Sequence, residues 1–204
     1  NLASCSKKEE KVSLIKEKNL EMQMIEAYNE GLKEFNKGDV FFAAKKFNVD
    51  TVINCTADNP FVDPAYIDLI YDFHKNQGND FTKIDGLPWG AFSYAISTNA
   101  LEKACQLKDE TDTEVWHGYF METKNFKWSS MKVDDNDLYW PELRLTVDVP
   151  EDFEMISKIF DELYDGKSVF SLKEIINLCR KDPSIPQINN NILQKKGIPI
   201  KIKK

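Results

Sequence analysis

The spacing of apolar side chains changes character near residue 49. Before that point apolar residues recur mostly at intervals of three and four, for example at Leu20, Met24 and Tyr28, which is the pattern of an amphipathic helix. Gly38-Asp39 then marks a helix end and a new start. Residues 1–48 are therefore predicted to form a helical hairpin.

From residue 49 onward, short β-branched runs alternate with stretches of helical periodicity. The predicted strands cover 51–55, 91–97, 126–133 and 143–147. The predicted helices cover 65–75, 99–106, 111–122, 150–164 and 172–180. Strands separated by helices at this spacing indicate an α/β fold over 49–204.

Composition narrows the possible functions. The formal net charge of −7 argues against a general nucleic-acid binder. No run of 18 apolar residues is present that could span a bilayer. The four cysteines and two histidines show no zinc-binding spacing, and isolated cysteines are typical of a reducing compartment.

Two acidic residues follow predicted strands, Asp58 after the run TVINC and Asp148 after LRLTV. Ligands of open α/β sheets bind at the carboxyl ends of strands, and two carboxylates there suit Mg²⁺. The contexts Asp-Asn-Pro and Asp-Val-Pro also suit a loop turn and a helix cap. Pattern alone favours the turn and cap, and both alternatives stay open at this point.

Four segments carry a family resemblance. They are TADNPFVDPAYIDLI (56–70), DTEVWHGYF (112–120), LRLTVDVPEDFEMISKIFDELY (143–164) and FSLKEIINLCRKDPSIPQIN (170–189). In this order they resemble the spore-coat polysaccharide biosynthesis cytidylyltransferases, which are close to acylneuraminate and KDO cytidylyltransferases. The resemblance implies a Rossmann-like, nucleotide-diphospho-sugar transferase-like sheet with helices.

The resemblance also implies a chemistry. Such enzymes move a cytidylyl group from CTP to a sugar acid or related sugar and release pyrophosphate, in the cytoplasm, with small-molecule partners only. Asp58 and Asp148 would be the catalytic Mg²⁺ ligands. A homodimer is compatible with this reading.

Five further residues are candidates for substrate binding: Asn59, Arg144, Glu114, Trp116 and Tyr119. For Arg144, four residues before Asp148, a structural ion pair is favoured over a phosphate contact. For the three residues of the predicted helix at 111–122, packing or surface roles are favoured over contact with the sugar.

The N-terminal segment departs from that family, which normally begins with a Gly- and Arg-containing triphosphate loop. Residues 1–48 hold no arginine and only Gly31 and Gly38. LASC (2–5) fits a lipobox with Cys5 as the lipidated residue, and AYNEGLKEFNKGDVFFAAKKF (27–47) resembles the first tetratricopeptide helix pair of the outer-membrane β-barrel assembly lipoproteins.

The first β-α-β unit is therefore expected to be replaced, in a chimeric chain with weak or no CTP turnover. The chain begins at Asn1, so a processed chain or a fragment is expected. The alternative function is a lipid-anchored, protein-binding helical module at the periplasmic face of the outer membrane, with membrane contact only if Cys5 is lipidated.

Overall fold

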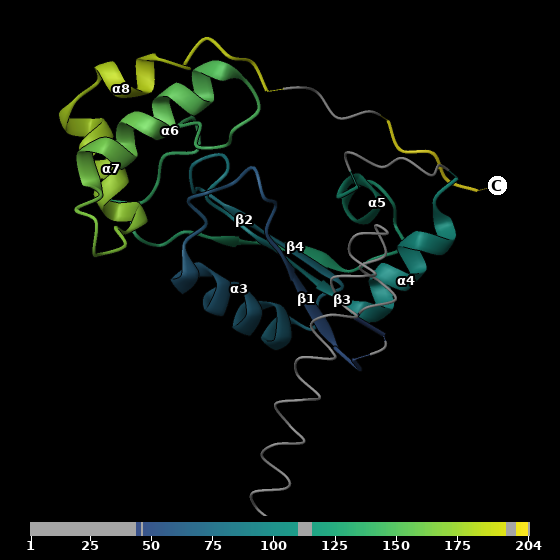
Figure 1. Cartoon of the computed structure of the whole chain (residues 1–204). Coiled ribbons are helices and arrows are strands. Elements are labelled where there is room, and N and C mark those ends of the chain that lie inside the picture. The colour runs from purple at the N-terminus through teal and green to yellow at the C-terminus, as the bar shows by residue number, and fades with distance from the viewer. Residues whose placement is uncertain (1–43, 46, 110–115, 195–198, 204) are drawn as a thin grey trace, which may run out of the picture. The chain divides into compact units, whose positions relative to one another are not determined.

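The computed structural model describes residues 44–45, 47–109, 116–194 and 199–203 (Figure 1). The chain divides into two compact units, Asn1–Asp50 and Thr51–Lys204. The predicted helical hairpin of residues 1–48 lies almost wholly outside the described residues. Nearly all of the described residues belong to the second unit.

A four-stranded sheet in the order β1-β3-β2-β4 forms the centre of this unit. The strands are β1 (Thr51–Asn54), β2 (Phe81–Asp85), β3 (Tyr94–Ser97) and β4 (Trp128–Lys132). β3 runs antiparallel to β1 and β2, whereas β2 and β4 are parallel. β1, β2 and β4 therefore share one direction, and the loops that follow them emerge at the same edge of the sheet.

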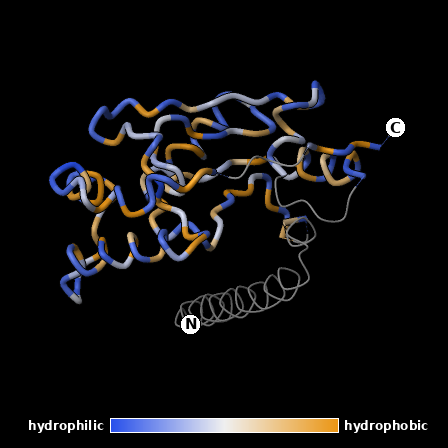
Figure 2. Tube along the Cα trace, turned by 90° about the horizontal axis from the view of Figure 1, so that it is seen from above, coloured by the Kyte–Doolittle hydropathy of each residue, from blue (hydrophilic) through white to orange (hydrophobic). Residues whose placement is uncertain are grey.

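The helices of this unit are α3 (Pro64–Gln77), α4 (Thr98–Leu107), α5 (Gly118–Met121), α6 (Pro150–Leu163), α7 (Leu172–Lys181) and α8 (Ser184–Gln187). Apolar and polar residues alternate along them (Figure 2), as expected for helices that cover a core on one side. α6, α7 and α8 pack together as a group beside one end of the sheet (Figure 1).

Each face of the sheet has its own core because side chains alternate along a strand. Ile84 and Ala95 join a core with Ile70 of α3 and with residues of α6, α7 and α8. Phe81 and Ile96 join a second core with α4 and α5. The sheet is thus covered on both sides, which is the α/β arrangement that the sequence predicts.

Local signals explain where α3 begins and ends. Asp63 accepts a 2.8 Å hydrogen bond from the backbone N–H of Ala65, and Pro64 occupies the first helical position. Gly78, at φ +58°, ends the helix in the left-handed conformation that glycine adopts readily.

Two features of the sheet differ from the prediction. β2 is not among the predicted strands. The predicted strand at 143–147 makes only an isolated parallel bridge, from Arg144 to Trp89. The reason is local: Trp89 runs beside this segment through hydrogen bonds with Leu143 and Leu145, and the chain then turns at Gly90, where φ is +91°.

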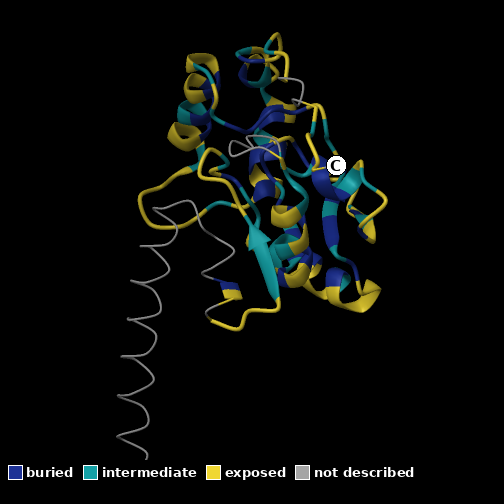
Figure 3. Ribbon diagram, turned by 90° about the vertical axis from the view of Figure 1, so that its right-hand side faces the viewer, coloured by how far each residue is buried: buried dark blue, intermediate teal, exposed yellow. Residues whose placement is uncertain are grey.

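β1 lies at one end of the strand order and is half-buried along its whole length (Figure 3). No helix in the described part of the chain is long and apolar enough to cross a bilayer.

Candidate metal and nucleotide site

The loop after β1 presents Asp58 to solvent. The backbone N–H and side-chain amide of Asn59 both bond back to Thr56, at 3.1 and 2.7 Å, and close a tight turn. This turn leaves the Asp58 carboxylate exposed and without a hydrogen bond or ion pair to any described residue. The loop is therefore built so that a carboxylate is available at the edge of the sheet.

A second acidic loop lies against the first. The carbonyl oxygen of Asp58 accepts hydrogen bonds from the backbone N–H of Val147, at 2.9 Å, and from the Thr146 hydroxyl, at 3.4 Å. Asp148, which is also exposed, follows directly. The backbone thus brings the loops of both predicted metal ligands together.

Arg144 is buried and engaged by carboxylates. Its Nη2 donates to Asp148 at 2.6 Å. Its Nε and Nη2 donate to the two oxygens of Asp152, each at 2.8 Å, as a two-pronged pair. Nη1 bonds to Gln194. Of the two roles considered for Arg144, the geometry shows the structural ion pair.

Asp152 is fully buried, with an exposed fraction of 0%. It also accepts hydrogen bonds from the backbone N–H of Asp148 at 3.0 Å and from the Asn189 amide at 2.9 Å. Burial by itself would raise the pKa of Asp152, but the bonds from Arg144, Asp148 and Asn189 outweigh burial and hold that pKa below its usual value. The bond to Asp152, opposed by burial, raises the pKa of Arg144 in turn.

The remaining predicted residues have different environments. Tyr119 is buried in the second core and its hydroxyl donates to the carbonyl of Lys201 at 3.0 Å. Trp116 is partly buried and packs edge-on against Phe81. Packing is therefore the observed environment of both, and a sugar contact stays a prediction. Glu114 and Cys5 lie outside the described residues.

Sequence reasoning missed three buried side-chain oxygens, one in the loop of Asp58 and two on neighbouring chain segments at the end of β1. The side-chain oxygens of Asn54, Asn59 and Ser93 are buried and have no hydrogen-bond partner. Asn54 ends β1 and pairs in register with Tyr94, which Ser93 precedes. No sequence signal marks a buried oxygen as unpaired, since pairing is a property of the assembled fold.

Aromatic rings lie beside this group. The Tyr94 ring lies 5.5 Å from that of Trp116 and 6.0 Å from that of His117, which stacks on it at an interplanar angle of 14°. Burial raises the pKa of Tyr94 to about 12 and lowers that of His117, so both side chains are uncharged at neutral pH. This end of β1 therefore combines unpaired oxygens with neutral rings.

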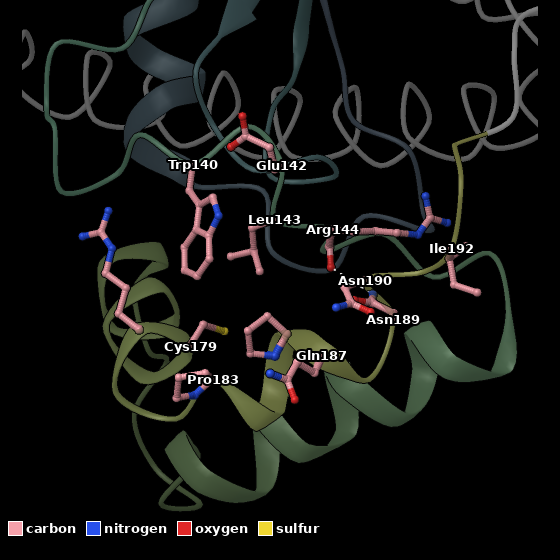
Figure 4. Close-up of a pocket in the computed structure, with 12 residues that line it drawn as sticks. Trp140, Glu142, Leu143, Arg144, Cys179, Pro183, Gln187, Asn189, Asn190 and Ile192 are labelled. Atoms are coloured by element: carbon pink, nitrogen blue, oxygen red, sulfur yellow. Dashed lines mark hydrogen bonds between the residues drawn. The ribbon is translucent and has the colours of Figure 1, made fainter.

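A cavity of about 600 Å³ lies between the 140–144 segment and the residues of α7, α8 and the segment after α8 (Figure 4). Trp140 and Leu143 form one wall, and Cys179 and Gln187 face them (Figure 4). The Arg144 guanidinium points away from this cavity, whereas its backbone carbonyl accepts a 3.1 Å bond from Asn189 at the cavity wall (Figure 4).

The exposed pair of loops fits a hard divalent cation. Among the described residues, no three His, Cys, Asp or Glu side chains gather into a site. Mg²⁺ does not require three, because it commonly takes one or two protein carboxylates and fills its octahedron with phosphate and water oxygens. Asp58 and Asp148 are the two carboxylates that these adjoining loops present, and Mg²⁺ binding by them stays a prediction.

Comparison with known proteins decides the family. A sequence model of the cytidylyltransferases matches residues 7–190, most of the chain. The chain belongs to the cytidylyltransferase family. The match confirms the resemblance of the four segments, and because it begins at residue 7 it also runs through the segment that resembles a lipoprotein. These comparisons give the lipoprotein resemblance no support.

Two relatives and one solved structure place this cytidylyltransferase-family chain more closely. It is 28% identical over 135 residues to the spore coat polysaccharide biosynthesis protein SpsF of Bacillus subtilis. The matched region covers 65% of this chain and 55% of SpsF. It is 29% identical over 160 residues to an uncharacterised protein of Methanocaldococcus jannaschii, which covers 77% of this chain and 65% of that protein.

The structure of a cytidylyltransferase from Leptospira borgpetersenii superposes with a TM-score of 0.64 at 25% identity, over 78% of this chain and 66% of the other. This similarity confirms the predicted Rossmann-like α/β fold. The chain spans 55 to 66% of the length of these relatives.

Proposed function

We propose that this chain carries the metal-holding part of a sugar-activating cytidylyltransferase. In the proposed reaction a hydroxyl oxygen of a sugar acid or related sugar bonds to the α-phosphorus of CTP and gives up its proton to water. The bond from that phosphorus to the bridging oxygen breaks, and pyrophosphate leaves with the electron pair. The observation that carries the proposal is the Val147–Asp58 hydrogen bond, which joins the acidic loop after β1 to the segment that carries Asp148.

The acidic residues and Arg144 have different roles in this proposal. Asp58 and Asp148 hold Mg²⁺, which when bound neutralises charge on the triphosphate. Arg144 is engaged by Asp148 and Asp152, so its role is to orient a carboxylate rather than to grip phosphate.

The end of β1 suits the sugar. Asn54 and Ser93 offer buried, unpaired oxygens that hydroxyl groups of a sugar can satisfy. The Tyr94 and Trp116 rings beside them supply an apolar wall. This placement supports the prediction that Trp116 belongs to the sugar side, although Tyr119 is occupied by its bond to Lys201.

Turnover is expected to be slow, since residues 1–48 contain no Gly- and Arg-rich loop to position the triphosphate. Positioning and charge neutralisation supply most of the catalysis in phosphoryl-type transfer. Metal binding is therefore a better test of the site than CTP consumption.

The experiment is a titration of the full chain with Mn²⁺, as a paramagnetic substitute for Mg²⁺, followed by electron paramagnetic resonance with and without CTP. Asp58→Asn and Asp148→Asn should each weaken Mn²⁺ binding by about tenfold or more. Asp63→Asn is the matched control, because Asp63 lies near Asp58 but caps α3, and asparagine caps equally well.

Unchanged Mn²⁺ affinity in both Asp58→Asn and Asp148→Asn would overturn the proposal. An equal loss in Asp63→Asn would do the same, since it would show that any carboxylate in this region attracts the ion.

A further inference from the structure

The side chain and the backbone N–H of Asp148 both belong to one closed ring of hydrogen bonds. Its side chain accepts from Arg144, Arg144 donates to Asp152, and Asp152 accepts from the backbone N–H of Asp148. The ring restricts rotation about the two side-chain bonds of Asp148, so its carboxylate is ordered before a metal arrives and less conformational entropy is lost on binding.

We propose that Arg144, Asp152 and Asn189 are positioning residues that fix the Asp148 carboxylate with one oxygen free for the metal. The inference rests on the proposed function, since it assigns Asp148 to the metal. It gives Arg144 a role other than substrate binding, adds Asp152 and Asn189 to the candidate site, and extends that site to the segment after α8.

Arg144 engages one oxygen of the Asp148 carboxylate. Arg144 binds Oδ2 of Asp148 at 2.6 Å, whereas Oδ1 has no partner among the described residues. A carboxylate held through one oxygen presents the other in a defined direction, which is what a one-oxygen ligand for an octahedral cation requires.

The positive charge of Arg144 would itself affect cation binding at Asp148. If Arg144 paired with Asp148 alone, its full positive charge would compete with a cation for the same carboxylate. Asp152 shares that charge through two 2.8 Å bonds. The buried carboxylate therefore acts on Asp148 in two ways: it fixes the guanidinium, and it leaves Asp148 with negative charge to offer.

Asn189 supports this ring through two hydrogen bonds. Its amide donates to Asp152 at 2.9 Å and to the Arg144 carbonyl at 3.1 Å. With an exposed fraction of 2%, it forms part of the wall of the 600 Å³ cavity (Figure 4). Partners bonded directly to a metal ligand commonly change metal affinity by ten- to a hundredfold when they are removed. Asn189 acts through Asp152, so its removal should have a smaller effect.

The test measures Mn²⁺ affinity by electron paramagnetic resonance in full-length Asp152→Asn and Asn189→Ala chains, at a temperature where circular dichroism shows them folded. We expect the dissociation constant to rise about tenfold in Asp152→Asn and about threefold in Asn189→Ala. Ile185→Ala is the control for lost stability, because Ile185 is fully buried on α8 and belongs to the hydrophobic core, with a side chain that cannot hydrogen-bond to the ring.

The outcomes separate the two proposals. Wild-type affinity in Asn189→Ala and in folded Asp152→Asn would overturn the positioning role while leaving the metal site intact. An equal loss in Ile185→Ala would also overturn it, because general loosening would then explain the effect. If Asp152→Asn does not fold, Asn189→Ala decides alone. A wild-type chain that binds no Mn²⁺ overturns the metal site and this inference together.

Discussion

The backbone N–H of Val147 donates a 2.9 Å hydrogen bond to the carbonyl oxygen of Asp58. The Thr146 hydroxyl supports this contact at 3.4 Å, and neither acidic side chain takes part in it. A change of Asp58 or Asp148 to asparagine should therefore alter charge at the site without moving the loops.

Gly90 is the position where this geometry is most sensitive. Its φ is +91°, and a Cβ there would lie 2.6 Å from the Thr146 nitrogen and 2.8 Å from the Leu145 carbonyl carbon. Gly90→Ala combines backbone strain with overpacking, so we expect the free energy of unfolding to fall by about 2 to 4 kcal/mol. Urea denaturation followed by fluorescence measures it.

Gly166→Ala is the control for that experiment. Gly166 has a similar φ of +80°, but a Cβ there meets nothing within 4 Å. Only backbone strain applies, and the loss should be about 1 kcal/mol. Equal losses at the two positions would show that the contact with Leu145 and Thr146 has no energetic weight.

Asp152 predicts a dependence of stability on pH. Its pKa is lowered in the folded chain, so its contribution is complete above the unfolded-state pKa of about 3.9 and is lost as pH falls through the folded-state value. Asp152→Asn removes the buried carboxylate partner of Arg144 and leaves the partly exposed Asp148 as its carboxylate partner among the described residues. The free energy of unfolding should fall by about 3 kcal/mol at pH 7.

The difference between wild type and Asp152→Asn should shrink as the pH falls below about 4. Denaturation curves at pH 7, 5 and 3 measure it. A difference that stays constant over this range would mean that the Asp152 charge does not stabilise the fold.

The elements that sequence predicts well have strong local signals. α3 has its Asp63 cap, Pro64 and terminal Gly78, and α7 has the reciprocal hydrogen bonds of Ser171 and Glu174. β2 was missed because FTKID carries two charged residues, Lys83 and Asp85, which form an ion pair of 2.7 Å. Its place in the sheet comes from pairing with β3 and β4 rather than from its own sequence.

Only part of the candidate site could likewise be predicted from the sequence. The positions of Asp58 and Asp148 after strand-like runs predict one shared edge, and the loops do meet there. The spacing of Arg144 and Asp148 also anticipates their ion pair. The partnership of Arg144 with Asp152 and Asn189 could not be predicted, because it depends on how α6 and the segment after α8 pack beside an irregular stretch of chain.

The cap of α3 gives a test that is independent of the metal. Asp63 accepts the backbone N–H of Ala65, so Asp63→Ala should lower the free energy of unfolding by about 1 kcal/mol, whereas Asp63→Asn should change it little. Thermal denaturation followed by circular dichroism compares the two. A loss in Asp63→Asn as large as in Asp63→Ala would assign the effect to charge rather than to capping.

The thiols offer a final prediction. Cys179 is 1% exposed, and burial, with a smaller effect from Asp182, raises its pKa to about 11. At pH 8 only about one Cys179 in a thousand would be the reactive thiolate, against about a quarter for an ordinary thiol. Cys55 and Cys105 are exposed in the same structure, and although partial burial also raises the pKa of Cys55, both thiols can be reached by a reagent in solution.

Brief alkylation with iodoacetamide at pH 8, mapped by mass spectrometry, should therefore modify Cys55 and Cys105 well before Cys179. In 6 M guanidinium all three should react at similar rates, since unfolding removes the burial that protects Cys179. Rapid native modification of Cys179 would show that α7 opens readily beside the cavity, and the packing described here for α7 would then be wrong.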